Sequence, residues 1–282
     1  MFAVLILAAT LATATPAPNP GPTLSPQGIL RAIRAQFRSH RPPPPYVVYR
    51  IERFQKDTNG YTDFANSYKY KVWYRSSDHA ALEREVAYYQ PGILNPALKF
   101  DRPAFNEERD PGPPTADLFE PAPVHPHTLD FVPTPEAKGT APPIIGSVVV
   151  AGEYDYNVIS VDYEGDLVHL RLSPVRDPDR NRLREIWAER KTYELRKLIA
   201  TDKLFIEGSK GRRVYGVLFT ITMKMLDGMP VVSDIHGVVG DGYHDDGQIV
   251  DYHFTDITFP KTLPDWYFDV RQYKARANQA PN

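Results

Sequence analysis

The residues of this sequence best suited to acid–base or metal chemistry lie in one glycine-flanked loop. The loop at residues 240–247 contains Asp241, His244, Asp245 and Asp246. Carboxylate oxygens beside an imidazole could bind a divalent ion, and such an ion would support a metal-assisted hydrolase. The same residue types are common in solvated hairpin turns. We therefore expect a turn here and no metal site, and we keep the metal-assisted hydrolase as the most distant alternative.

Other titratable residues form no recognisable catalytic group. His125 and His127 stand alone in a proline-rich stretch, and Glu83 and Glu85 share a side of a strand through simple alternation. The sequence has no Gly-x-Ser-x-Gly, His-Glu-x-x-His or phosphate-loop motif. It also has no cysteine, which excludes thiolate chemistry and cysteine-based metal sites. We expect no enzymatic activity, no catalytic residue and no cofactor.

The charge balance argues against nucleic acid as a partner. Lys+Arg 33 and Asp+Glu 35 give a formal net charge of -2. A nucleic-acid-binding surface needs clustered positive charge, and so does a surface that adheres to anionic membranes. We expect neither kind of partner.

The start of the sequence resembles a secretory signal peptide. Residues 2–12 form an uncharged apolar run, which is shorter than the roughly 20 apolar residues of a membrane-spanning helix. The small-x-small triplet at 12–14 then provides a cleavage site. The lack of cysteine means that the chain is not itself a lipoprotein, and it favours a bacterial envelope over a disulfide-stapled scaffold. We expect a signal peptide at 1–14 and a periplasmic or secreted mature chain without a transmembrane span.

One helix is predicted after a flexible tether at residues 15–24. Ser25 can cap this helix and Pro26 suits its first position. The prolines at 42–45 end it. Its apolar stripe is formed by Ile29, Ile33 and Phe37.

Most of the remaining chain alternates with the period of a β-strand. Residues 66–75 place tyrosines and a valine on one side, and Trp73 on the other side indicates that this second side is also partly covered. Short turns between successive strands are typical of an antiparallel meander. We expect about 9–11 strands, at residues 46–54, 66–75, 82–89, 148–150, 154–163, 167–172, 183–188, 193–205, 215–225, 230–239 and 248–259.

Residues 91–143 differ from the rest because they are rich in proline and lack a clear period. We interpret them as an insertion that packs irregularly over the sheet, since they contain apolar side chains such as Leu118 and Phe119. A mobile loop is the alternative. With this insertion, residues 25–270 are expected to form a single domain, and residues 271–282 a flexible C-terminal tail.

The clearest strand of the sequence has a continuous apolar side. That side consists of Tyr215, Val217, Phe219, Ile221, Met223 and Met225. Methionine adapts its shape to irregular apolar partners, so this side suits either a ligand or an ordinary core.

Three parts of the C-terminal half resemble the outer-membrane lipoprotein-sorting superfamily of LolA/LolB-like carriers. In chain order they are the strand–turn–strand unit at 167–195 with Pro174, the strand pair at 215–239, and the closing segment at 251–268 with Leu263-Pro264-Asp265 and Phe268. The helix after Ser25 also lies where this family places its N-terminal helix. The order and spacing of these parts, rather than any one of them, carry the resemblance.

The resemblance implies a mainly β (α+β) fold, in which a strongly curved antiparallel sheet forms a half-open β-barrel. An N-terminal helix lies against its concave face, and that face accommodates acyl chains. The ligand-binding residues would be Tyr215, Val217, Phe219, Ile221, Met223 and Met225, together with Ile29, Ile33 and Phe37.

We therefore expect a non-enzymatic periplasmic carrier or sensor that binds a lipid or lipidated protein in an apolar groove. The alternative is an envelope protein–protein interaction module with a filled core and no small-molecule ligand. A further alternative is a glycan-binding platform of exposed tyrosine and tryptophan side chains.

Overall fold

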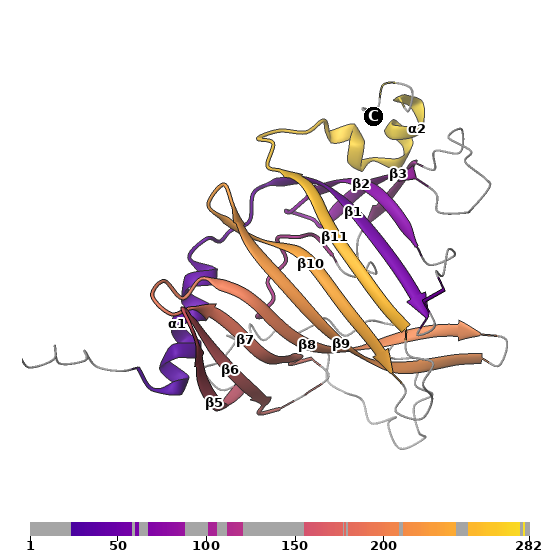
Figure 1. Cartoon of the computed structure of the whole chain (residues 1–282). Helices are drawn as coiled ribbons and strands as arrows, with labels where there is room; N and C mark the ends of the chain where they lie inside the picture. Colours follow the sequence, from indigo (N-terminus) through magenta and orange to yellow (C-terminus); the bar gives the residue numbers. More distant parts are fainter. Residues whose placement is uncertain are drawn as a thin grey trace, which may run out of the picture.

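Most of the chain forms one large antiparallel sheet, with the helix α1 (Pro26–Arg38) against one side of it (Figure 1). The structure is a computed structural model. It describes residues 24–57, 60–61, 67–87, 101–105, 112–120, 155–176, 178, 180–208, 211–240, 248–276 and 279.

The sheet has 11 strands in the order β4-β3-β2-β1-β11-β10-β9-β8-β7-β6-β5. The strands are β1 (Tyr46–Asp57), β2 (Tyr68–Arg75), β3 (Ala80–Ala87), β4 (Asp101–Phe105), β5 (Tyr156–Glu164), β6 (Leu167–Pro174), β7 (Leu183–Glu189), β8 (Leu195–Gly208), β9 (Gly211–Leu226), β10 (Met229–Gly240) and β11 (Gln248–Thr258). Strands that follow one another in the chain pair with each other, except that β1 pairs with β11 and β4 and β5 form the two edges. The sheet is therefore open, and the predicted fold class is confirmed.

Irregular strand pairing explains why the sheet bends. The register shifts between Val48 and Arg50, between Val158 and Ser160, and between Val232 and Asp234, among other places. An extra residue on one strand bends that strand and increases its twist. Figure 1 shows the resulting curved sheet, with α1 beside β5–β7 and far from β1–β3.

The helix α1 begins and packs as the sequence predicts. The backbone N–H of Gly28 donates to the Ser25 hydroxyl over 3.1 Å, which caps the first turn. Ile29, Leu30, Ile33 and Phe37 are buried. The helix therefore buries one stripe against the sheet. Arg31 is exposed, whereas the half-buried Arg34 places its guanidinium carbon 5.5 Å from the centroid of the Phe119 ring.

A glutamine of α1 attaches the helix to the edge of the sheet. The Gln27 side-chain amide donates to the Tyr156 carbonyl over 2.7 Å, and its oxygen accepts from the Val158 N–H over 3.4 Å. These are backbone groups that a further strand would otherwise use. Gln27 therefore covers the start of the β5 edge, a common way to protect an exposed edge strand.

A second apolar cluster covers the other side of the sheet at β1–β3. The 3-10 helix η4 (Asp265–Phe268) and α2 (Val270–Arg276) bring Tyr267 and Tyr273 against Trp73, which is 3% exposed. The Trp73 and Tyr267 rings meet edge to face at 6.0 Å. The cover expected from Trp73 is thus present. In place of the flexible tail expected from residue 271, the chain continues as α2, because Tyr273 is 2% exposed in this cluster.

Two parts of the Pro-rich insertion lie on the sheet. Residues 101–105 form β4 although the sequence predicted no strand there, because their backbone pairs with β3 and Pro103 can occupy an edge strand. Residues 112–120 cross the same side as α1, where the Pro114 carbonyl accepts from the Val232 N–H over 2.8 Å. Phe119 packs edge to face on Phe37 at 5.4 Å between ring centroids.

Several predictions fall outside the described residues. These are the signal peptide at 1–14, most of the tether, the strand at 148–150, His125, His127 and the acidic loop residues Asp241, His244, Asp245 and Asp246. The strand predicted at 193–205 begins at Leu195 in the structure. Tyr193 has a φ of 61°, which is outside the range of extended backbone, so it cannot be part of the strand.

Candidate functional site

The candidate site is the side of the sheet against which α1 packs, which we call the inner face; the opposite side is the outer face. On β9, Val217, Phe219, Ile221 and Met223 point to the inner face, whereas Leu218 and the exposed Thr222 point to the outer face. Strands β1, β2, β5–β8, β10 and β11 contribute to the same inner cluster. The inner face is therefore mainly apolar across these strands.

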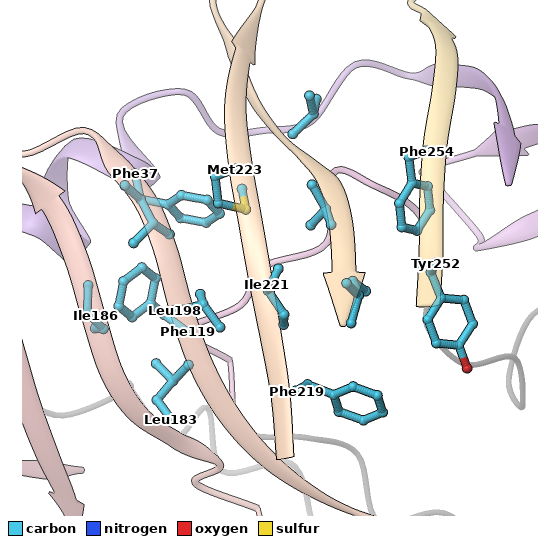
Figure 2. Packing of buried hydrophobic residues seen from close by; sticks show 14 of the residues in the cluster. Phe37, Phe119, Leu183, Ile186, Leu198, Phe219, Ile221, Met223, Tyr252 and Phe254 are labelled. Carbon is cyan, nitrogen blue, oxygen red and sulfur yellow. The ribbon is translucent and has the colours of Figure 1, made fainter. Parts of the chain in front are cut away.

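The residues predicted to bind a ligand come together on this face. Phe219, Ile221 and Met223 follow one another along β9, with Phe37 and Phe119 in the same layer of side chains (Figure 2). Val217, Ile29 and Ile33 belong to this cluster too. Met225 is half-buried, and the side chain of Tyr215 lies outside the described residues.

The part of the inner face near α1 is closely packed. Ile33 is 0% exposed and Phe37 is 2% exposed, and Met223 on β9 is 4% exposed. Ordinary core packing and a displaceable helix plug both produce this arrangement. A ligand that used these residues would have to take the place of α1 side chains.

Close approach of β9 and β10 shapes the middle of the inner face. Gly237 lies directly opposite Phe219 across the two strands. A Cβ at Gly237 would lie 2.5 Å from Cε1 of Phe219, so the ring occupies the space that a side chain at this position would need. The absence of a side chain at Gly237 therefore allows the Phe219 ring to pack in the apolar layer.

The far end of the inner face, at β1, β2 and β11, is more polar. Val47, Tyr49 and Ile51 of β1 are buried, and Arg53 and Gln55 continue the same alternation. Gln55 is 2% exposed, whereas Arg53 is only partly buried. The half-buried Tyr68 and Tyr70 of β2 pack beside them, with their rings tilted by 42° and their centroids 4.7 Å apart. This end combines aromatic rings with a guanidinium.

Burial shifts the pKa values of several titratable groups on the inner side, among them Tyr74 and Arg41. Burial raises the pKa of Tyr74 to about 12, with Asp78 adding to the effect, and its hydroxyl lies 2.6 Å from Nδ1 of His79. Burial lowers the pKa of Arg41, which stacks over Phe37 at 5.3 Å. Neither shift brings a group into the range where a general acid or base works near neutral pH.

Histidines on the outer face are held by carboxylates. His236 pairs with Asp251 at 2.6 Å and His253 with Asp234 at 2.8 Å, across β10 and β11. His169 lies between Glu164 and Glu185 and stacks on Trp187 at 4.0 Å. Within the described ranges no three His, Asp or Glu side chains converge as a metal site would require. These contacts link neighbouring strands.

Sequence reasoning overlooked Arg53. It follows Val47, Tyr49 and Ile51 at the spacing of a strand, and a charged residue in an otherwise apolar register is a signal that could have identified it.

Among the helices that the structure describes, none has the length and apolar character of a membrane span.

Comparison with known proteins finds structural neighbours but no match by sequence. A LolA superfamily protein from Nitrosomonas europaea aligns with 86% of this chain and 97% of its own, at 11% identity and a TM-score of 0.39. A DUF1329 family protein from Desulfovibrio piger aligns with 86% and 98%, at 10% identity and a TM-score of 0.42. A chain of the MucA/MucB complex of Pseudomonas aeruginosa aligns with 84% and 95%, at 12% identity and a TM-score of 0.19. No family model and no curated protein matches the sequence.

Proposed function

We propose that this protein is a non-enzymatic carrier or sensor that binds the acyl chain of a lipid or lipidated protein on the inner face of its sheet. The observation that supports this most is the extent of that face. Apolar side chains line it on strands β1–β3 and β5–β11, whereas in the described part of the chain only α1 and residues 112–120 lie over it. A sheet with one apolar side needs a cover.

The energy of such binding comes from burial alone. Each CH₂ group removed from water contributes about 0.8 kcal/mol, so one acyl chain gains several kcal/mol without any chemical step. Met223 and the half-buried Met225 suit a lining that adjusts to a flexible chain. The proposed binding residues are the alternate residues Tyr215, Val217, Phe219, Ile221, Met223 and Met225 of β9, together with Ile29, Ile33 and Phe37 of α1.

The helix α1 is the part that a ligand would displace. Its polar attachments to the rest of the chain include the two Gln27 bonds to β5 and the Arg38–Asp117 ion pair at 3.3 Å. Exposed or half-exposed ion pairs contribute roughly 0–1 kcal/mol. The helix is held mainly by its apolar stripe, and an acyl chain can replace that contact with one of the same kind.

The proposed place of action is the bacterial envelope. The support is the signal-peptide pattern at 1–14 and the absence of cysteine. A carrier that handles lipids there needs no lipid anchor of its own.

A photoreactive fatty acid tests this function on the full mature chain. A C16 acid with a diazirine in its tail is mixed with the protein and irradiated, and the modified residues are located by peptide mass spectrometry. We expect a 1:1 adduct on Phe219, Ile221 or Met223. Leu218 is a built-in control because it is apolar and 46% exposed on the outer face of the same strand. Labelling confined to Leu218, or no stoichiometric adduct, contradicts the proposal.

An envelope interaction module with a filled core is the second candidate. It is favoured by the close packing of Ile33 and Phe37, which are 0% and 2% exposed. Native mass spectrometry after mild extraction distinguishes the two functions. Co-purified lipid or uptake of an acylated peptide supports the carrier, whereas a lipid-free protein that takes up neither supports the interaction module.

A further inference from the structure

Arg53 is the one arginine on the inner face of β1, and its surroundings differ from those of the outward-facing arginine of the same strand. Arg53 lies directly opposite Tyr252 of β11 on one side and Tyr68 of β2 on the other. Its guanidinium carbon is 5.7 Å and 5.8 Å from the centroids of these two rings. A planar cation is thus held between two aromatic rings on an apolar surface.

Among the described residues, the Arg53 side chain has one hydrogen-bond acceptor. Nη2 donates to Oε1 of Gln55 over 2.7 Å, and the buried Nε has no hydrogen-bond partner. No carboxylate in the described ranges forms an ion pair with Arg53, whereas Arg50, on the outer face of the same strand, pairs with Asp256 at 3.2 Å. A guanidinium offers five N–H donors in a fixed planar arrangement.

A buried or half-buried charge without a counter-ion is costly, and an arginine favours two-pronged contact with carboxylate or phosphate oxygens. Gln55 holds the guanidinium from one side, and its own backbone N–H donates to the Ser67 hydroxyl over 3.1 Å. The arginine is therefore positioned before any ligand arrives. A guanidinium that is fixed in this way and forms no ion pair with a described carboxylate is suited to an oxyanion.

The neighbouring inner-face residues are apolar. Moving along β1 from Arg53, the next inward side chain is Ile51, which is 6% exposed and lies opposite Phe254 of β11. Phe254 in turn packs against Tyr49 at 5.7 Å between ring centroids. An anionic group at Arg53 therefore has an apolar path beside it, along which a hydrocarbon tail can lie.

We propose that Arg53 recognises the oxyanion head group, carboxylate or phosphate, of an amphiphile whose acyl tail lies on the inner face. This inference rests on the proposed carrier function and specifies its ligand class. The partly exposed Arg53, Tyr68 and Tyr70 leave the head group near solvent while the tail is buried. A lipid without an anionic head group would bind more weakly.

The test compares three probes and two variants of the full mature chain. The probes are palmitate, hexadecyl phosphate and uncharged methyl palmitate, with affinities measured by displacement of a fluorescent fatty acid. The variants are Arg53→Met and, as the matched control on the outer face of the same strand, Arg50→Met. Charge-assisted hydrogen bonds of this kind correspond to roughly a 10–100-fold change in affinity.

We expect Arg53→Met to weaken binding of both anionic probes by that factor and to change methyl palmitate binding less than about threefold. Arg50→Met should leave all three affinities unchanged. A change in palmitate but not in hexadecyl phosphate binding identifies a carboxylate ligand, and the reverse a phosphate ligand. Both outcomes support the proposal.

Equal affinity of the wild type and Arg53→Met for both anions, with methyl palmitate still bound, overturns the role of Arg53 and leaves the carrier function intact. Failure of the wild type to bind any probe overturns the carrier function itself. Circular dichroism checks whether each variant folds. If Arg53→Met does not fold, the affinities for the two anionic probes are measured with Arg53→Lys instead. Lysine keeps the charge but loses the planar donors, so we expect several-fold weaker anion binding, and unchanged binding overturns the inference.

Discussion

At the scale of single residues, the two faces of the sheet use polar groups differently. On the outer face, cross-strand partners such as Asp234 and His253 are hydrogen-bonded to each other. On the inner face, the described neighbours of the Arg53 guanidinium are two aromatic rings and an amide, with no carboxylate among them. The outer pairs link neighbouring strands. The Arg53 guanidinium is, in our proposal, the group that binds the oxyanion head group of a ligand.

Asp234 predicts a small acid-dependent loss of stability. Burial acts to raise the pKa of Asp234, but hydrogen bonds from His253 and Ser233 outweigh it and hold the pKa below its usual range. A carboxyl whose folded pKa is depressed adds stability above its unfolded pKa near about 4, and this contribution is lost as pH falls through the lower folded value. Because both partners are about half exposed, the effect should be roughly 0.2–1 kcal/mol.

Urea unfolding of the wild type and Asp234→Asn between pH 5 and pH 2 checks this. The difference in free energy of unfolding should be largest at pH 5 and shrink toward zero as the pH falls. A difference that stays constant to pH 2 would show that the ionised carboxylate of Asp234 contributes nothing to folding.

Gly237 should tolerate no side chain. In Gly237→Ala the new Cβ would meet the Phe219 ring at 2.5 Å and 2.8 Å, so the ring or strand β10 must move. We expect a destabilisation of about 1–3 kcal/mol, as for other overpacked cores. Phe219→Leu relieves the clash, and the double variant should lose less than the sum of the two single variants. Additive losses in thermal unfolding would disprove the direct contact.

At this scale the sequence predicts part of the site and misses the rest for a physical reason. The inward side chains Val217, Phe219, Ile221 and Met223 follow from strict alternation on one strand. Arg53 becomes informative only when Tyr68 and Tyr252 are known to flank it, and those contacts depend on which strands pair. Pairing between distant segments is not encoded in local periodicity.

At the scale of elements, α1 has a capped N-terminus and, through Gln27, covers part of the β5 edge of the sheet. The sequence predicts the cap at Ser25 and the apolar stripe, and both are present. It does not predict that Gln27 occupies the backbone groups of Tyr156 and Val158, because a glutamine on a helix has many possible partners. The strand β4 was also missed, since backbone pairing with β3 overrides the low strand propensity of its proline.

Gln27→Ala should loosen α1 from the β5 edge. Loss of two hydrogen bonds should cost about 1–2 kcal/mol, and the Val158 amide should exchange faster with deuterium. Gln27→Glu is the matched control, because its carboxylate can still accept from the Val158 N–H but cannot donate to the Tyr156 carbonyl. Unchanged exchange at Val158 in Gln27→Ala would show that the edge is protected by something else.

At the scale of the whole molecule, one sheet separates two apolar clusters. The inner cluster includes α1, and the outer cluster joins Trp73 to Tyr267 and Tyr273 of the C-terminal helices. Strands β1–β3 belong to both, because their alternate residues point to opposite sides. Loss of the outer cover should therefore weaken the inner face as well.

Tyr273→Ala tests this coupling. Truncating a buried aromatic side chain should cost about 3–5 kcal/mol, and the loss should appear as a lower midpoint of a single unfolding transition. Lys274→Ala on the exposed side of α2 is the control and should change little. Separate unfolding of the C-terminal helices, seen as an early change in tryptophan fluorescence with the sheet intact, would contradict a shared core.

The pairing of β1 with β11 has a consequence for the speed at which this protein folds. Strands β1–β4 can form hairpins as soon as they exist, and so can β5–β11, but the two groups meet only at β1 and β11. We expect this pairing of Tyr46–Asp57 with Gln248–Thr258 to form last, because the two segments are far apart in the chain. Loop closure over such a distance makes folding slow. Until it occurs, two unpaired strand edges are open to aggregation, so a chaperone that shields them should raise the yield of refolding.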